Sequence, residues 1–573
     1  MDLSKKSWLF VVPVSLLLVF PAFAQTQVPK QATSGVVEKN LEEKVQTPST
    51  SVQREQVFQQ LEFPQTALQM EEGKALDVKS FNITGNTLFK TKALKRLVAK
   101  YAKPGAHFND LLMACDQINA FYREKGFFLT RAILPAQEIK DGVVSIQIVE
   151  GRLGQVVVQG GKFYKADFIK KHFVCAQKGI FNYNELMRSL VILNEYPDLQ
   201  VKAVLKKGQE PFTTDIFLTV EDKRPFHTFV DYNNAGSRYV STHRAGAGVE
   251  YSNLIAQGDK MSLRGVSGSP ARTQGYASAS YELPINSYGT KASFSYQWSE
   301  FNVGREYRRL NAGGNSVAYN LSLTHPLKRT LTSSMDVLLG FDYKNLDNFL
   351  LGAETSKDRL RIANFGITGD FLEKSLQGRD YYKIIFSQGC PSLWGGDSRN
   401  NPVASREGAG SFFFRSNIEL GRYQSLPWDM ILLTKGRTQM ASDVLPASEQ
   451  FDIGGVDTVR GFPSSEHLGD TGSVLNAELT LPPFFGAHQV PFLHKTLKEF
   501  MRIVGCIDYG ITYAKNPQPG EAKSNEITGA GVGVRLDFGH DLNAKVDVGF
   551  PIAGDEPSSG DHAAVYVQVI KTF

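Results

Sequence analysis

The feature that most constrains this chain is a two-residue alternation of apolar and polar side chains that runs through residues 225–573. Leu475 and Ala477, for example, alternate with Asn476 and Glu478. A period of two is the period of a β-strand, and no helical period interrupts the region. One strand face is polar throughout. It therefore lies either on the outside of a soluble β domain or on the inside of a membrane barrel.

Three features favour the membrane barrel. The apolar face carries aromatic residues near the strand ends, as the aromatic girdles of membrane barrels do. The region is long and unbroken, and it ends on the alternating stretch AAVYVQVIKTF. Its terminal Phe573 is typical of the closing strand of an outer-membrane barrel. We therefore predict an all-β antiparallel transmembrane barrel of about 16 strands. A soluble β domain is the alternative.

The N-terminus has the pattern of a secretory signal peptide. Lys5 and Lys6 precede the apolar run WLFVVPVSLLLVFPAFA, which ends in the small-residue site Ala22-Phe23-Ala24. The run is short and contains proline, so a membrane anchor is the weaker interpretation. We predict a signal peptide over residues 1–24 and export of the mature chain.

The segment that follows, residues 25–74, is rich in Gln, Thr, Ser and Glu. It has few apolar residues to bury, so we expect a polar linker. Within it, residues 52–63 could form a short helix through Val57, Phe58 and Leu61.

Residues 75–151 and 152–224 each show the same order of expected elements, β-α-α-β-β. In the first unit, the second helix is expected to begin at about Asn109, as its N-cap, and to end at Gly126. The repeat period of roughly 75 residues indicates a tandem array of small α+β units rather than one large domain. Two such units therefore precede the barrel.

The composition excludes several functional classes. The net charge is +5 with acids and bases nearly balanced, so we expect no nucleic-acid partner. The sequence contains no P-loop, HExxH, EF-hand loop or GxSxG elbow, so we expect no cofactor, no metal and no enzymatic activity. The cysteines are widely spaced, which predicts buried thiols, with a bridge as the alternative in an oxidising compartment. They are Cys115, Cys175, Cys390 and Cys506.

The first repeat ends in a pattern of fixed positions, P-x-Q-x-I-x-x-G followed by alternating apolar residues and E-G. With this pattern the chain resembles the outer-membrane transporters of two-partner secretion, the TpsB family, within the superfamily of outer-membrane assembly barrels. That family calls the repeats POTRA domains. The second repeat fits more loosely, because Asp198 stands where the family often has glycine. The motif positions of the first repeat are Pro135, Gln137, Ile139, Gly142, Glu150 and Gly151.

A second motif lies in residues 451–470, on a long loop between two predicted strands. Its core resembles the VRGY/F motif that the superfamily carries on a loop folded into the barrel, and it consists of Val459, Arg460, Gly461 and Phe462. The resemblance implies that the arginine pairs with the aspartate of a wall motif F-x-D-x-G. CIDYG fits that motif with Asp508 and Gly510, although Cys506 replaces the aromatic residue.

Alternation independently places Asp508 and Gly510 on the inner wall of the barrel. Arg535, Asp537 and Glu478 are also candidates for inward positions, so the partner of Arg460 stays open at this point. Two opposite charges inside a crowded barrel would be poorly hydrated, and neither is tolerated alone.

The resemblance also implies a helix near the N-terminus that plugs the barrel, and residues 52–63 are the one candidate for it. It implies a function as well. The chain would be an outer-membrane pore that secretes a large β-helical exoprotein, such as a haemolysin or an adhesin, from the periplasm to the surface of a Gram-negative-type bacterium. Its POTRA domains would recognise the client in the periplasm, outer-membrane lipid would surround the barrel, and the protein would act as a monomer. The alternative is an insertase that assembles other barrels. The periplasmic repeats argue against a passive porin, and a barrel enzyme would need a catalytic pair, which the sequence does not show.

Overall fold

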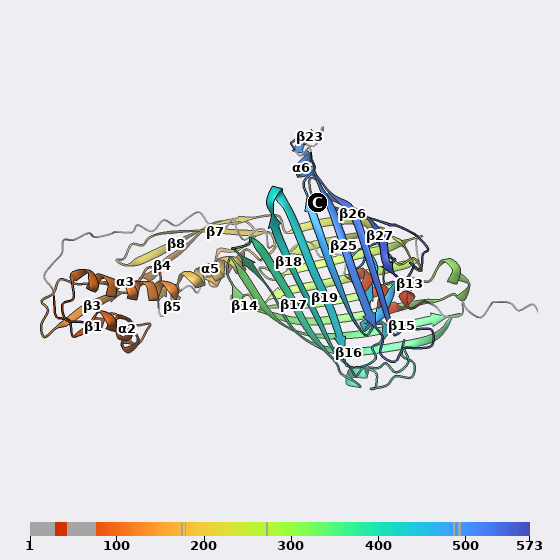
Figure 1. Ribbon diagram of the computed structural model, residues 1–573, viewed down its shortest axis with the longest axis horizontal. Coiled ribbons are helices and arrows are strands. Elements are labelled where there is room, and N and C mark those ends of the chain that lie inside the picture. Colours follow the sequence, from red (N-terminus) through yellow and green to blue (C-terminus); the bar gives the residue numbers. More distant parts are fainter. Residues whose placement is uncertain are drawn as a thin grey trace, which may run out of the picture.

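The computed structural model describes residues 29–42, 76–173, 176–177, 179–270, 273–484, 487–490 and 494–573. Figure 1 shows an elongated molecule in which two small α+β units lie at one end of a large β-barrel, with a short helix inside the barrel. No helix within those ranges is long and apolar enough to cross a membrane. The predicted signal peptide and the helix expected over residues 52–63 lie outside the described residues.

The first unit has the predicted order β-α-α-β-β. Its central strand β3 is parallel to β1 and antiparallel to β2. Leu94 and Ile118 from the two helices share one buried core with Ile146 of the sheet. The elements are β1 (Ser80–Thr84), α2 (Thr91–Val98), α3 (Phe108–Glu124), β2 (Arg131–Ile133) and β3 (Val143–Val149).

Helix α3 begins slightly earlier than the sequence suggested. It starts at Phe108, and His107 rather than Asn109 is the N-cap. The His107 backbone is extended and its N–H donates to Asp110 Oδ2 at 2.9 Å, which closes the first turn before Asn109 could act as a cap. After the helix Gly126 has a φ of 90°, a conformation that suits glycine at a helix C-terminus.

The second unit repeats this order and adds two short strands between its helices. The sheet order is β5-β6-β4-β8-β7, with β4 and β8 parallel. Ile169 and Leu190 from the helices pack with Leu218 from the sheet in a separate buried core. The elements are β4 (Arg152–Gly160), α4 (Ala166–His172), β5 (Ala176–Gln177), β6 (Ile180–Phe181), α5 (Tyr183–Leu193), β7 (Leu199–Lys207) and β8 (Thr213–Asp222).

The remainder of the chain forms a closed antiparallel barrel of 16 strands, in which the last strand, β28, pairs with the first, β9. This confirms the predicted barrel and rules out a soluble sandwich. Side-chain exposure follows the alternation, because Leu475 and Ile507 are 58% and 56% exposed on the outer wall while Asp508 is buried on the inner wall.

The barrel strands follow one another around the wall in chain order. They are β9 (Phe226–Asn233), β10 (His243–Ser252), β11 (Lys260–Ser269), β12 (Gln274–Pro284), β13 (Lys291–Asn302), β14 (Gly313–Arg329), β15 (Ser333–Leu350), β16 (Ala353–Glu373), β17 (Gly378–Gly389), β18 (Phe414–Leu426), β19 (Met430–Ala441), β22 (Thr471–Leu481), β25 (Met501–Tyr513), β26 (Ser524–Gly539), β27 (Leu542–Gly554) and β28 (Ala564–Thr572).

The strand connections lie at two opposite ends of the barrel. The unit end is the end where β8 leads into β9, and the chain also finishes there, because Phe573 N–H donates to the Thr228 carbonyl at 2.8 Å. The other end is the far end. A long far-end connection contains β20 (Phe451–Ile453) and β21 (His467–Gly469), whereas a unit-end connection contains β23 (Gln489–Val490), β24 (Lys495–Thr496) and α6 (Leu497–Phe500).

Polar contacts fix the second unit to the barrel. Arg329 Nε donates to Glu195 Oε2 at 2.9 Å. Asp198 accepts from Ser252 Oγ at 2.9 Å, and its Oδ1 lies 2.7 Å from His227 Nε2. Asp198 has a φ of 61°, so it adopts the left-handed conformation that explains why glycine is common at this position. The aspartate side chain also joins the unit to β9 and β10, through His227 and Ser252.

Candidate functional site

The far-end connection between β19 and β22, residues 442–470, folds into the barrel. We call it the inner loop. Strands β20 and β21 form a short hairpin within it. Val459 and Phe462, close to its tip, are both completely buried. The inner loop is therefore an ordered part of the barrel interior rather than a solvated surface loop.

Arg460 at the tip of the inner loop binds Asp508 on β25. Arg460 Nε donates to Asp508 Oδ2 at 2.7 Å and Nη2 donates to Asp508 Oδ1 at 2.9 Å. The Arg460 backbone N–H also donates to Oδ2, at 3.1 Å. Both side chains are buried, with exposures of 6% and 0%. The planar guanidinium fork suits this two-point contact with a carboxylate.

The ion pair belongs to a network on the inner wall. Arg460 Nη1 donates to Glu478 Oε2 on β22 at 2.8 Å. Arg535 on β26 lies 3.4 Å from Glu478 and 2.7 Å from Asp547 on β27. The structure thus places two acids at Arg460, Asp508 and Glu478.

Asp537 does not take part in this network. Its carboxylate pairs with Lys495 at 2.9 Å, and its side chain is 52% exposed. Strand β26 ends two residues later, at the unit end of the barrel. Of the inward acids that the sequence suggested as partners of Arg460, Asp537 is therefore the one that the structure separates from it.

Glycines on the wall make room for the inner loop. A Cβ on Gly510 would lie 2.8 Å from Val459 Cγ2, a Cβ on Gly529 would overlap the carbonyl oxygen of Arg460, and a Cβ on Gly549 would overlap the Gly461 backbone nitrogen. These three glycines lie on β25, β26 and β27, three adjacent strands. Together they form a part of the wall without side chains, against which the loop packs.

Tyr566 on β28 completes the seat of the loop tip. Its hydroxyl donates to the Phe462 carbonyl at 2.7 Å and accepts from the Gly461 N–H at 3.2 Å. Gly461 has a φ of 101°, a conformation that favours glycine. The wall therefore binds the backbone of the motif as well as its arginine side chain.

Sequence reasoning did not assign roles to Gly529, Gly549 or Tyr566. The signal was present for all three. Alternation places Gly529 and Gly549 on the inner wall and makes Tyr566 an aromatic residue on a polar face. Neither feature identifies a loop contact by itself, because the partner lies about 100 residues away in sequence for Tyr566.

Helix α1 (Ser34–Glu42) lies inside the barrel (Figure 1), against the inner loop. Lys39 Nζ pairs with Asp452 at 2.7 Å. Asn40 donates to Ser465 Oγ at 3.0 Å and accepts from Ser464 Oγ at 2.9 Å. The helix and the inner loop are therefore held together mainly by polar contacts.

The position of α1 corrects the expectation that only residues 52–63 could place a helix in the barrel. Val37 and Leu41 are buried against a small apolar cluster at the wall. Arg244 of β10 donates to the Asn40 carbonyl near the C-terminus of α1, at 3.2 Å. The stretch looks like linker in the sequence because its polar residues find partners only inside the barrel.

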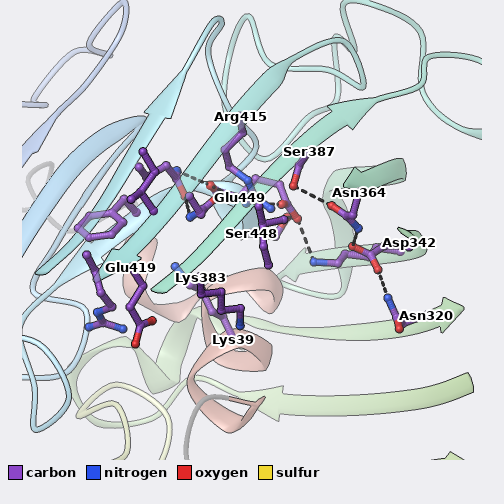
Figure 2. A pocket seen from close by; sticks show the side chains of 18 of the residues that line it. Lys39, Asn320, Asp342, Asn364, Lys383, Ser387, Arg415, Glu419, Ser448 and Glu449 are labelled. Carbon is purple, nitrogen blue, oxygen red and sulfur yellow. Dashed lines mark hydrogen bonds and ion pairs between the residues drawn. The ribbon is translucent and has the colours of Figure 1, made fainter. Parts of the chain in front are cut away.

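A polar cavity of about 490 Å³ separates α1 and the inner loop from part of the wall. Figure 2 shows Asn320, Asp342, Asn364 and Ser387 joined in a chain of hydrogen bonds along that wall. Glu449 of the inner loop pairs with Arg415 at 2.6 Å and with Lys344 at 3.1 Å. This part of the barrel interior is thus lined by polar and charged side chains.

The motif residues of the first repeat hold that unit together. Gln137 donates to the Ser145 carbonyl at 2.8 Å and accepts from the Ser145 N–H at 2.6 Å, as a neighbouring strand would. Ile139 packs against the buried core. Gln137 also donates to the Pro135 carbonyl, at 3.3 Å.

Two glycines of the motif allow close backbone contacts. A Cβ on Gly142 would lie 2.8 Å from the Asp77 carbonyl, and one on Gly151 would lie 2.5 Å from Leu129 Cβ. The motif therefore serves the folding of the unit, and none of its side chains forms a cluster with the barrel network.

Glu150 accepts hydrogen bonds from the Thr87 N–H at 3.0 Å, from the Leu88 N–H at 3.2 Å and from the Tyr122 hydroxyl at 2.9 Å. We expect Glu150→Gln to destabilise the first unit by about 1–3 kcal/mol, because the new amide would face donors. Urea-dependent limited proteolysis of the full-length protein measures this loss. Glu138→Gln, at an 87% exposed side chain, is the control and should change nothing. Equal stability of the two variants would contradict the assigned role of Glu150.

The described residues contain no group of three or more His, Cys, Asp or Glu side chains that could hold a metal ion. In that part of the chain Cys115, Cys390 and Cys506 are free thiols, and Cys175 lies outside it. Cys115 is buried as predicted, whereas Cys390 and Cys506 are only half-buried. Burial raises the pKa of the Cys115 thiol to about 12, so this group stays protonated and unreactive.

Comparison with known proteins decides the family. The family model described as haemolysin secretion/activation protein ShlB/FhaC/HecB matches residues 213–536, more than half of the chain. The chain belongs to this family. A second model, the ShlB-type POTRA domain, matches residues 76–151. The protein is therefore an outer-membrane transporter of two-partner secretion, with POTRA domains in the periplasm and a large exoprotein as its partner.

Individual relatives agree with this assignment. The heme/hemopexin transporter protein HuxB of Haemophilus influenzae is 24% identical over 90% of this chain and 88% of its own. The outer membrane transporter CdiB of Escherichia coli is 23% identical over 88% of this chain and 83% of its own. The solved structure of CdiB from Escherichia coli has a TM-score of 0.75 at 22% identity and covers 89% of this chain and 93% of its own, which shows a shared fold.

Proposed function

We propose that this transporter carries one large β-helical exoprotein through its barrel in an extended state, as a monomer and without a catalytic step. The observation that supports it most is the content of the barrel. Both the inner loop and α1 occupy the lumen, and polar side chains and backbone groups hold them there, together with a small apolar cluster in which Val459 and Phe462 pack with the wall. The polar contacts can be exchanged for contacts with water or with a passing polypeptide at little net cost.

The two POTRA domains would recognise the client. Strand β7 (Leu199–Lys207) lies at one end of the second sheet and β2 (Arg131–Ile133) at one end of the first. An edge strand offers backbone N–H and C=O groups to an extended segment, which gives affinity with modest demands on the client sequence. The contacts between Arg329 and Glu195 hold the second domain close to the barrel entrance at the unit end.

A polypeptide can cross the barrel only after the lumen is cleared. Helix α1 touches the inner loop through Lys39 and Asn40, so movement of either element removes contacts of the other. We infer that the resting protein is closed by these two elements together. The tip of the inner loop stays bound to the wall through Arg460 and Asp508 until the client displaces it.

A deletion strain tests the function. The proteins in the culture medium and in the outer membrane are compared between that strain and its parent by mass spectrometry. We expect the loss of one large exoprotein from the medium, with an otherwise unchanged outer membrane, and this result also identifies the client. Depletion of many other outer-membrane barrels with normal secretion would contradict the proposal and support barrel assembly instead.

A further inference from the structure

A second buried ion pair lies at the far end of the barrel, away from the Arg460 network. Arg406 belongs to the connection between β17 and β18, residues 390–413, which we call the strap. Arg406 Nη1 donates to both carboxylate oxygens of Asp470 at 2.8 Å. The two side chains are only 2% and 0% exposed, although they lie at the mouth of the barrel.

Asp470 is the last residue of the inner loop before β22 begins. Its carboxylate also accepts from the Leu445 N–H at 2.7 Å and from the Lys515 N–H at 2.6 Å. Leu445 lies in the segment where the inner loop leaves β19, and Lys515 lies in the next far-end connection, residues 514–523. One carboxylate thus joins both ends of the inner loop to a neighbouring connection.

Arg406 adds the strap to this junction. Its Nη2 donates to the Lys515 carbonyl at 2.9 Å and to Glu521 Oε2 at 3.2 Å. The adjacent Ser405 accepts from the Ala447 N–H of the inner loop at 3.0 Å. Three separate far-end connections therefore meet at one guanidinium group.

A buried ion pair adds little net stability, but removing one partner leaves an uncompensated buried charge. Such a pair therefore selects one arrangement of the segments that it joins. We propose that Arg406 and Asp470 form an exit clasp, a fastening separate from the Arg460–Asp508 pair, which closes the far-end mouth and must part when the client leaves. The proposal rests on the proposed function in one respect, that the client exits by this mouth.

Channel recordings on the full-length protein in planar lipid bilayers test the clasp without any client. Arg406→Gln removes the charge that joins the strap to the inner loop, so Asp470 keeps two backbone donors but loses its cation, and the base of the inner loop is freed to leave its closed position. We expect the fraction of time in a conducting state to rise by about tenfold, since the closed arrangement loses a charged contact. Arg406→Lys should restore closure in large part because it returns the positive charge, whereas Arg406→Met, which is long but uncharged, should conduct as Arg406→Gln does.

Lys357→Gln is the matched control, because Lys357 pairs with Glu354 at the same end but is 40% exposed. It should leave the recordings unchanged. The double variant Arg406→Gln/Asp470→Asn should show much less than the product of the two single effects, because both substitutions break one contact. Recordings of Arg406→Gln that match the parent protein, or an equal increase in the control, would overturn the clasp.

If Arg406→Gln does not reach the membrane as a heat-modifiable barrel, Glu521→Gln replaces it. This change removes one charged acceptor of Arg406 and leaves the Asp470 pair, so a smaller opening is expected and parental recordings would again overturn the clasp. The secretion proposal fails separately. If Arg406→Gln conducts but the deletion strain loses no exoprotein, the clasp is supported and secretion is contradicted. If Arg406→Gln stays closed in the bilayer while the deletion strain does lose an exoprotein, the clasp alone is contradicted.

Discussion

Arg460→Ala is expected to reduce secretion of the exoprotein by at least about tenfold while the barrel stays in the outer membrane. The substitution removes the cation from a site where Asp508 is completely buried and Glu478 is close by. An unpaired buried charge costs about 3–5 kcal/mol, and two carboxylates left together also repel each other. The inner loop should then leave its seat, and α1 should lose the surface against which it packs.

The measurement compares the amount of client in the medium with the amount of heat-modifiable barrel in the outer membrane. Asp508→Asn should resemble Arg460→Ala, because Asp508 makes the two-point contact. Glu478→Gln should be milder, since Glu478 makes only one contact with Arg460. Asp537→Asn is the control and should secrete normally, because Asp537 pairs with Lys495 at the unit end. Parental secretion by Arg460→Ala would remove the role assigned to this residue.

The architecture could be predicted from the sequence because strands and helices each repeat their apolar residues at a characteristic spacing. Alternation at positions such as Leu475 and Asn476 reports directly which side chains meet lipid and which meet the lumen. Helical spacing in the two repeats gives the order of their elements. These are local rules, and they hold wherever neighbouring residues in sequence share one environment.

The contents of the lumen could not be predicted in the same way. Helix α1 has few apolar residues, and its Lys39 and Asn40 are satisfied only by a loop more than 400 residues away. The glycines under the loop give no sign of this contact in the sequence, since an inward glycine fits a wall that faces an open lumen as well as one against which a loop packs. Contacts of this kind depend on tertiary structure alone.

Beside the contacts of Glu449 and Tyr566, three ion pairs join different parts of the inner loop to different neighbours. Arg460 holds the tip on the wall, Lys39 of α1 holds the hairpin from inside the lumen, and Arg406 holds the base at the far end. All three are cations that bind acids through short hydrogen bonds. Because each one joins a different neighbour, a client could release them in sequence rather than at once, which lowers the free energy needed at any single step.

Gly529→Ala should reduce secretion as strongly as Arg460→Ala, by about tenfold or more, although it removes no charge. The new methyl group would overlap the carbonyl oxygen of Arg460. Strand β26 is hydrogen-bonded to β25 on one side and to β27 on the other, with a register shift beside Gly529 on the β27 side, and we expect the loop rather than the paired wall to move. Gly529 does not have the positive φ that alanine avoids, so the effect isolates the steric contact.

Gly505→Ala is a closely matched control for this experiment. Gly505 lies on β25, three positions before Asp508, and a Cβ there would have no neighbour within 4 Å. By alternation with the inward Asp508, Gly505 faces outward, so Gly505→Ala tests the glycine-to-alanine change on the neighbouring strand without any contact to the inner loop. Secretion and protease access to the inner loop in intact outer membranes measure the outcome. Equal secretion by the Gly529→Ala and Gly505→Ala variants would show that secretion does not require the inner loop to lie against the wall at Gly529. The Arg460–Asp508 pair would then act in secretion only after the loop has moved from this position.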